Sequence, residues 1–365
     1  MQKHSHNSLT AQALQRFKKN KLGVLSFWYV MLCGFVAVFA YVLAPDNSNN
    51  ANQMHLEIHS KKPGFEVDIL SIPNKYTAEK QSWFNQIIYG RNNNPTEIAI
   101  GAYSIKNDTI FYKSYAELAH LQQDKIFTPK DTSKSIQSYV GKRKFYLGTD
   151  KYGRDLMSRM LIGARISFFI GFIAVFISLL IGIFVGATAG YFGGKVDAFI
   201  MWIINITWSI PTLLLVIAIT LALGKGFWQV FIAVGLTMWV EVARVVRGQV
   251  MSAKKLQYVE AAKALGFSNS RIIFRHILPN IIAPVIVISA ANFAAAILIE
   301  SGLSFLGIGA QPPTPSWGAM IKDHYSYIIL GKAYLAVIPG LAIMSLVMAF
   351  MLIGNALRDA LDVKS

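Results

Sequence analysis

The chain has 365 residues, of which 54% are hydrophobic and only 15% are charged, and this composition excludes an ordinary soluble protein. The net charge of +16 comes from basic residues dispersed between apolar runs, which suits loops that meet anionic lipid and argues against nucleic-acid binding. Cys33 is the single cysteine, so the sequence excludes an internal disulfide and a cysteine-based zinc site.

The N-terminal 22 residues predict a polar cytoplasmic tail. Basic side chains gather just before the first apolar run, as the positive-inside rule requires of a cytoplasmic segment: Arg16, Lys18, Lys19 and Lys21. Residues 23–44 are long enough to cross a bilayer and too long for a cleavable signal, so they predict a retained first transmembrane helix.

Residues 45–147 have a different character and predict a small α+β insert outside the cytoplasm. Residues 65–72 alternate as a half-buried strand does, residues 97–105 and 109–114 predict a hairpin, and a helix is expected over 115–123. The lysines of this insert do not oppose an extracytoplasmic location, because long loops cross membranes largely regardless of charge.

A metal site within the insert is a weaker alternative. His55, Glu57 and His59 would share one face if this segment were a strand, but such residues on a polar surface are more often simply solvated.

The second span is expected over about residues 166–189. Three arginines lie just before this span: Arg154, Arg159 and Arg165. We expect them to follow a turn and to extend their charged ends to the membrane interface. Small residues at intervals of four predict close helix packing: Gly182, Gly186, Gly190 and Gly194.

Four further spans are expected, over about residues 198–223, 227–240, 281–299 and 334–357. Pro211 should bend the third, either to line a cavity or to accommodate a neighbour. An ion pair with local snorkelling accounts for three charged residues after the fourth, Glu241, Arg244 and Arg247. Trp317, in the Gly- and Pro-rich loop after the fifth span, is expected to anchor at the interface.

The end of the fifth span carries a carboxylate, Glu300, followed by Ser301. At this depth a carboxylate lies either at the interface, where its cost is small, or in the bundle interior, where it usually has a task. With Pro211, these two residues are candidates for the transport pathway or its gate.

Between spans four and five the segment 248–280 is too polar for lipid, so it predicts a folded cytoplasmic loop. Residues 258–265 favour a helix that stops at Gly266, and Ser268 can cap a second helix that ends before Pro279. Leu265 and Phe267 should then lie at an exposed corner that can enter a groove on a partner. An amphipathic loop lying on lipid headgroups is the alternative.

Several motifs resemble those of permease subunits in ATP-binding-cassette importers. The loop contains Glu260-Ala261-Ala262, Gly266 and Ile277-Leu278-Pro279, which is similar to the EAA signature of those subunits. His276 departs from the usual Ile, in the way of the peptide branch. The segments at 148–150, 153–155, 163–167, 301–307 and 311–318 further resemble the second permease subunit, of DppC/OppC type, in the dipeptide, oligopeptide and nickel branch.

This resemblance implies an all-α polytopic fold of six transmembrane helices, the type I importer permease fold, with a permease core over 148–365. It implies a bacterial inner-membrane protein with cytoplasmic termini that forms half of a peptide pathway. Its implied partners are a second, related permease, two cytoplasmic ATPases, an extracytoplasmic binding protein and membrane lipid. The residues expected to couple it to the ATPases are Glu260, Ala261, Ala262, Leu265, Gly266, Phe267 and Pro279.

No phosphate-binding Gly-rich loop is present in the sequence, so no cofactor is expected and ATP would be bound by the partner subunits. An intramembrane enzyme has no support, since neither an HExxH nor a GxSxG motif occurs. The alternative that stays open is a membrane-anchored sensor or receptor that acts through the insert.

Overall fold

The computed structural model describes residues 9–73, 81–92, 95–115, 125–129, 135–224 and 226–361. It divides into two compact units, each assembled from separate segments. The helical unit comprises Met1–Gly34, Ser167–Gln311 and Gly340–Ser365, and the sheet unit comprises Phe35–Ile166 and Pro312–Pro339.

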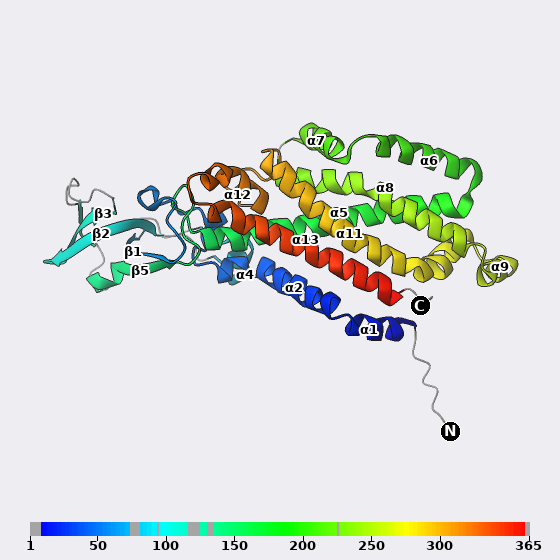
Figure 1. Ribbon diagram of the computed structural model, residues 1–365, viewed down its shortest axis with the longest axis horizontal. Coiled ribbons are helices and arrows are strands. Elements are labelled where there is room, and N and C mark those ends of the chain that lie inside the picture. The colour runs from blue at the N-terminus through cyan, green and yellow to red at the C-terminus, as the bar shows by residue number, and fades with distance from the viewer. Residues whose placement is uncertain are drawn as a thin grey trace, which may run out of the picture. The chain divides into compact units, whose positions relative to one another are not determined.

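Among the described residues, five helices are long and apolar enough to cross a membrane, and a broken pair would make a sixth span. The five are α2 (Lys21–Val38), α5 (Leu156–Phe192), α8 (Phe227–Ala253), α11 (Ile282–Phe305) and α13 (Tyr334–Leu361), coloured from blue to red along the chain in Figure 1. The broken pair, α6 (Gly194–Ser209) and α7 (Thr212–Leu223), is bent by 92° at Pro211, as the loss of a backbone donor predicts.

Helices α5 and α8 extend well beyond the apolar runs that predicted them. Charged residues continue α8 because they find partners on α6: Arg247 Nη2 donates to Asp197 Oδ2 at 2.6 Å, and the Arg244 guanidinium lies 3.8 Å from the Trp208 ring centroid. The ion pair predicted among Glu241, Arg244 and Arg247 therefore does not account for Arg247, since the partner of Arg247 lies on another helix.

Glycines bring α5 and α8 into contact, as their spacing predicts. A Cβ on Gly182 would lie 2.9 Å from the Trp239 carbonyl oxygen, and one on Gly190 would lie 2.7 Å from that of Arg247. Gly194 takes no part in this packing, because it begins α6 and a Cβ there would meet nothing within 4 Å.

The described part of the N-terminal segment is helical. It forms α1 (Leu9–Lys19), and Asn20 Oδ1 then accepts the Gly23 N–H at 2.9 Å as α2 begins. Farther along α2, the Tyr29 hydroxyl lies 2.6 Å from Ser345 Oγ on α13, which joins the first and last spans.

In the described part of the sheet unit the strands form an antiparallel sheet in the order β4-β3-β2-β1-β5, of which Figure 1 labels β1, β2, β3 and β5. Its strands are β1 (Phe65–Ile72), β2 (Thr96–Lys106), β3 (Thr109–Ser114), β4 (Lys125–Phe127) and β5 (Val140–Phe145). The predicted strand 65–72 is confirmed, and so is the predicted hairpin. The hairpin turns at Asn107 and Asp108, which both have a positive φ. Separate apolar clusters around Ile69 and around Leu70 bury β1 on both faces.

Short helices complete the sheet unit: α3 (Ala40–Leu43), α4 (Trp83–Tyr89) and α12 (Trp317–His324), with 3₁₀ turns η1 (Asn49–Ala51), η2 (Leu56–Ile58), η4 (Ile136–Tyr139) and η7 (Tyr325–Ile328). The helix predicted over 115–123 falls almost wholly on residues 116–124, which lie outside the described ranges.

The arrangement assumed for the metal alternative is wrong. His55, Glu57 and His59 flank and form the turn η2, so they do not share a strand face. His55 is buried, and its Nε2 lies 3.7 Å from the carboxylate of Glu97.

Candidate functional site

The loop between α8 and α11 folds as a helical hairpin, which we call the coupling hairpin (residues 257–281). Its first arm is α9 (Gln257–Ala264), which ends at Leu265 and turns at Gly266 with φ +75°. The Phe267 N–H donates to the Ala262 carbonyl at 3.1 Å and the Gly266 N–H donates to that of Lys263 at 2.9 Å. These bonds form a Schellman motif, in which glycine is favoured because the turn needs a left-handed residue.

The second arm begins where predicted but does not stop where predicted. Ser268 Oγ accepts the Arg271 N–H at 3.4 Å and caps α10 (Asn269–Arg271). A π-helical segment (Ile272–Ile277) and a 3₁₀ turn (Leu278–Ile281) then lead directly into α11. Pro279 lies in the first turn of the 3₁₀ segment, where its missing N–H removes no helical hydrogen bond.

One face of the hairpin packs into the helical unit. Val259, Ala262, Ile272 and Ile277 are buried in a cluster to which α5 and α8 also contribute, and Val250 is its member at the end of α8. Ala262 is therefore buried in this packing.

The other face is exposed and ends in two large apolar side chains. Leu265 is 73% exposed and Phe274 is 64% exposed, and Glu260 and Ala261 lie on the same exposed arm as Leu265. Leu265 thus lies at an exposed corner as predicted. The sequence analysis did not single out Phe274. Its position in the second arm could have identified it, because it lies between the buried Ile273 and Ile277 without sharing their face.

Phe267 does not extend outward with Leu265. It is partly buried, its ring stacks on His276 with centroids 5.7 Å apart, and the Arg271 guanidinium lies 4.5 Å from its centroid. The prediction that Phe267 lies at an exposed corner is wrong, because its backbone N–H closes the turn and its side chain covers the base of the second arm.

Polar contacts fasten the hairpin to α5 and to itself. The Tyr191 hydroxyl donates to Asn269 Oδ1 at 2.8 Å, and Lys254 Nζ donates to the Tyr191 carbonyl. Asn280 Nδ2 donates to the His276 carbonyl at 2.6 Å. The second arm is thus tied to the end of α5, and Lys254, which precedes the first arm, is tied to the same tyrosine.

Glu300 lies in the bundle interior and not at the interface. It is fully buried on α11, its Oε1 accepts from Ser304 Oγ at 2.6 Å, and its Oε2 lies 3.5 Å from Ser167 Oγ on α5 and 3.4 Å from Ser301 Oγ. Hydroxyl donors thus satisfy a carboxyl group that apolar burial would otherwise penalise.

The break at Pro211 and the end of α11 border one cavity of about 180 Å³. Ile210 and Thr212, on either side of Pro211, line it together with Ile299, the neighbour of Glu300. Pro211, Glu300 and Ser301 do not themselves line this cavity, so the structure brings the three pathway candidates to neighbouring positions without joining them in one site.

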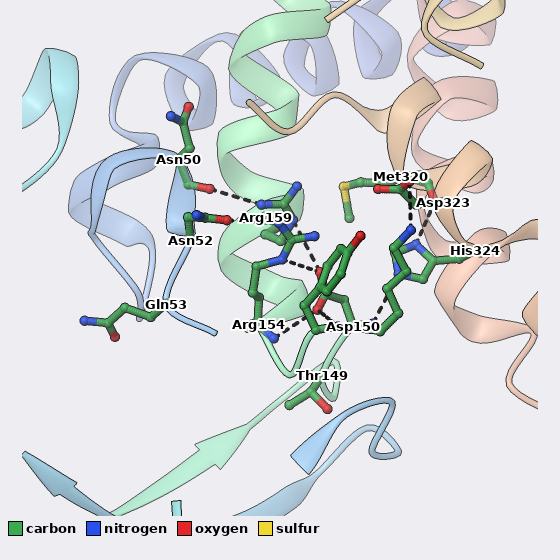
Figure 2. Close-up of polar contacts among 12 residues, drawn as sticks. Asn50, Asn52, Gln53, Thr149, Asp150, Arg154, Arg159, Met320, Asp323 and His324 are labelled. Atoms are coloured by element: carbon green, nitrogen blue, oxygen red, sulfur yellow. Dashed lines mark hydrogen bonds and ion pairs between the residues drawn. The ribbon is translucent and has the colours of Figure 1, made fainter. Parts of the chain in front are cut away.

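Within the sheet unit, the arginines expected at the membrane interface are instead buried around a carboxylate (Figure 2). Arg154 Nε donates to Asp150 Oδ2 at 2.6 Å, and Arg159 Nε lies 3.7 Å from the same oxygen. Arg159 also donates to the Asn50 carbonyl at 3.2 Å. Asp150 is fully buried, so the snorkelling prediction is wrong for Arg154 and Arg159.

Trp317 is likewise a packing residue and not an interface anchor. It is 4% exposed, its Nε1 donates to the Met160 carbonyl at 3.0 Å, and a Cβ on Gly163 would lie 3.0 Å from its ring. The motif around Gly163 therefore makes room for the indole.

Burial shifts the ionisation of groups near this cluster. Burial raises the pKa of Asp155 above its ordinary value, although the Ser158 hydroxyl and N–H act in the opposite direction. Burial also lowers the pKa of His324, and the Met320 carbonyl that contacts its Nδ1 at 2.7 Å opposes this only in part. Among the described residues, no group of three His, Cys, Asp or Glu side chains is placed to hold a metal ion.

Comparison with known proteins identifies the class. Residues 178–364 match the family described as binding-protein-dependent transport system inner membrane component, and residues 8–63 match the N-terminal TM domain of oligopeptide transport permease C.

Individual relatives are also transport permeases. Over 219 residues the chain is 41% identical to the glutathione transport system permease protein GsiD of Pectobacterium atrosepticum, and 42% identical to the dipeptide transport system permease protein DppC of Alkalihalophilus pseudofirmus. Each match covers 60% of this chain and 72% of the relative.

Among solved structures, the match to the inward-facing MetNI methionine ABC transporter covers 56% of this chain and 97% of that chain, at a TM-score of 0.45 and 19% identity. The two sequence matches suffice: the family match extends over half of the chain, and the relatives are aligned over most of their own length. The chain belongs to the inner-membrane permease components of binding-protein-dependent transport systems, the non-enzymatic, multi-pass subunits of ATP-binding-cassette importers.

Proposed function

We propose that this permease forms half of a pathway that imports small peptides. The substrate class is supported by two of its relatives, one a dipeptide permease and one a glutathione permease, since both cargoes are short peptides. The pathway half would comprise the permease core over 148–365, with Pro211, Glu300 and Ser301 near its gate.

The coupling hairpin supports the proposal that separate ATPase subunits drive transport. It exposes the apolar side chains of Leu265 and Phe274 above a buried base, and exposed apolar side chains on a helix are what a groove on a partner recognises. Each of two cytoplasmic ATPases would bind ATP and hold one such hairpin, this one through Glu260, Ala261, Leu265 and the turn at Gly266 and Phe267. Ala262 and Pro279 would support that surface from within.

Closure of the ATPases would then pull the hairpin, and the spans fastened to it would move as rigid bodies. The hairpin and both termini would lie in the cytoplasm, with residues 1–22 as the tail and 23–44 as the first span. The insert over 45–147 would lie outside, where a binding protein delivers cargo. The other half of the pathway would come from a related second permease.

The motor contact is tested by Leu265→Asp in the transporter reconstituted with its ATPases and binding protein. An anchor residue contributes about 2 kcal/mol or more to binding, so ATPase retention on the immobilised permease should fall at least about tenfold. Leu56→Asp is the matched control, because Leu56 is also a leucine, is 63% exposed and belongs to the sheet unit. Equal ATPase retention by both variants would refute the docking role of the hairpin.

The substrate class is tested separately by uptake. Proteoliposomes that contain the whole transporter should accumulate a labelled dipeptide in an ATP-dependent way, and unlabelled peptides should compete while free amino acids and nickel salts should not. Uptake of nickel without peptide competition would remove the peptide assignment and leave the permease assignment intact.

A further inference from the structure

The helix α4 of the sheet unit is fixed beside the end of the first span. It packs against α3, the last turn of that span, and Gly90 follows it with φ +77°. A Cβ on Gly90 would lie 2.8 Å from the ring of Tyr41 on α3, so the absence of a side chain allows this close approach. The Arg91 N–H then donates to the Asn47 carbonyl at 2.8 Å and holds the chain after α4 against the segment that follows α3.

A second span also holds α4. Arg165, on α5, donates through Nη1 to the carbonyls of Ile87 (3.2 Å) and Ile88 (2.6 Å), which are last-turn groups without helical partners. The same guanidinium lies 5.5 Å from the ring centroid of Tyr41. Tyr41 follows the first span and Arg165 precedes the apolar part of the second, so the residues that hold α4 border the apolar parts of both spans.

The side chains that α4 leaves uncovered are mostly aromatic. Trp83 is 71% exposed, Phe84 is 64% exposed and Tyr89 is 62% exposed, whereas Ile87 is buried and holds the helix in place. Val42, on the adjoining turn α3, is 60% exposed and continues the apolar surface of the first span.

The composition of α4 fits a lipid interface. Its sequence is Trp-Phe-Asn-Gln-Ile-Ile-Tyr, which has no charge and combines aromatic rings with amides. Tryptophan and tyrosine concentrate at membrane–water boundaries because one end of each ring system is apolar and the other can form hydrogen bonds.

We propose that α4 is an interfacial anchor whose Trp83 and Phe84 enter the boundary between the lipid headgroups and the acyl chains. The anchor would hold the sheet unit against the bilayer surface at the end of the first span. Lipid is the favoured occupant because α4 packs against α3, which follows the first span directly and carries the exposed Val42.

The test measures the depth of a spin label in the complete transporter, reconstituted in phosphatidylethanolamine–phosphatidylglycerol nanodiscs. On a Cys33→Ser background, nitroxide labels are placed at Trp83→Cys and, separately, at Phe84→Cys. Collision rates are measured with oxygen, which concentrates in acyl chains, and with a neutral nickel chelate, which stays in water.

Two controls bracket the result. Phe35→Cys reports lipid, because Phe35 lies on the first span and is 55% exposed, and Tyr103→Cys reports water, because Tyr103 lies on β2 and is 45% exposed. Both α4 labels should show an oxygen-to-nickel ratio several-fold above that of the Tyr103 label and closer to that of the Phe35 label. A ratio equal to that at Tyr103 would overturn the anchor. Low collision rates with both reagents would also overturn it, because they would place α4 against a protein partner.

Discussion

Ser304 Oγ donates to Glu300 Oε1 at 2.6 Å and accepts the Ala310 N–H at 3.2 Å, so one hydroxyl joins a buried carboxyl group to the turn that follows α11. Glu300→Ala would remove the acceptor and leave buried hydroxyls without this partner, at a cost of about 1–3 kcal/mol. Glu300→Gln keeps an acceptor oxygen of the same reach and should lose much less. Thermal unfolding of the detergent-purified transporter, followed by gel filtration, compares the two variants. An alanine variant as stable as the wild type would show that the cluster does not stabilise this turn.

The buried ion cluster of the sheet unit makes a second prediction. Asp150→Asn would leave Arg154 and Arg159 buried beside a neutral group, and breaking a buried pair in this way costs about 3–5 kcal/mol. The control is Glu66→Gln, which removes an exposed carboxylate that contacts Lys142 and Lys144. We expect a large fall in unfolding temperature for Asp150→Asn and no measurable change for Glu66→Gln. Similar small shifts for both would mean that the arginines find other partners.

His324 predicts how the stability of the sheet unit depends on pH. The buried ring contacts the Met320 carbonyl through Nδ1 and accepts the Lys151 N–H at 3.4 Å through Nε2, an arrangement for neutral histidine. Its pKa in the folded chain is below the ordinary 6.5, so below that pH the unfolded chain binds a proton that the folded chain does not. The unfolding free energy therefore has no penalty from His324 above about pH 6.5. As the pH falls below this value, protonation of His324 in the unfolded chain lowers the unfolding free energy by at most about 1.4 kcal/mol per pH unit.

The measurement is the unfolding temperature between pH 7.5 and 5.5 for the wild type and for His324→Gln, which cannot titrate. The wild type should lose more stability on acidification than the variant. Parallel curves would show that His324 is protonated equally in both states. Asp150 and Asp323 also act on the ring, and they are the same in both proteins, so the difference isolates His324.

The features that the sequence predicted are those encoded locally. Alternation predicted the strand Phe65–Ile72, although apolar clusters cover both faces of β1 where only one buried face was expected. Gly266 marked the end of α9 because the turn needs a positive φ. Apolar runs gave the spans, and Pro211 gave the break between α6 and α7, because both depend on the backbone and on side-chain hydrophobicity alone.

The features that it did not predict depend on partners distant in the sequence. The extent of α8 depends on Asp197, which pairs with Arg247 50 residues later. The burial of Trp317 depends on an acceptor at Met160, 157 residues earlier. Composition treats an arginine or a tryptophan near a span as an interface residue, so it could not distinguish these buried positions from exposed ones.

Close packing of α5 on α8 makes a fourth prediction. Gly190→Ala would place a Cβ 2.7 Å from the Arg247 carbonyl oxygen, so the helices would have to separate, at a cost of about 1–3 kcal/mol. Gly248→Ala is the matched control, because Gly248 lies inside α8 and a Cβ there meets nothing within 4 Å. The unfolding temperature should fall only for Gly190→Ala. If both variants unfold like the wild type, the contact between these helices is looser than the structure indicates.

The turn of the coupling hairpin makes the last prediction, which separates backbone strain from steric exclusion. A Cβ on Gly266 would meet nothing within 4 Å, so any cost of substitution comes from φ +75°, where a β-branched residue is disfavoured by about 1–2 kcal/mol and asparagine is tolerated. Gly266→Val should therefore distort the corner that presents Leu265 and lower the peptide uptake per ATP hydrolysed, whereas Gly266→Asn should keep most of it. The assay measures uptake and hydrolysis together in the same proteoliposomes. Full coupling in the valine variant would show that the ATPase does not recognise the shape of this turn. Equal losses of uptake per ATP in both variants would show that the surface needs the small size of glycine and not its conformation.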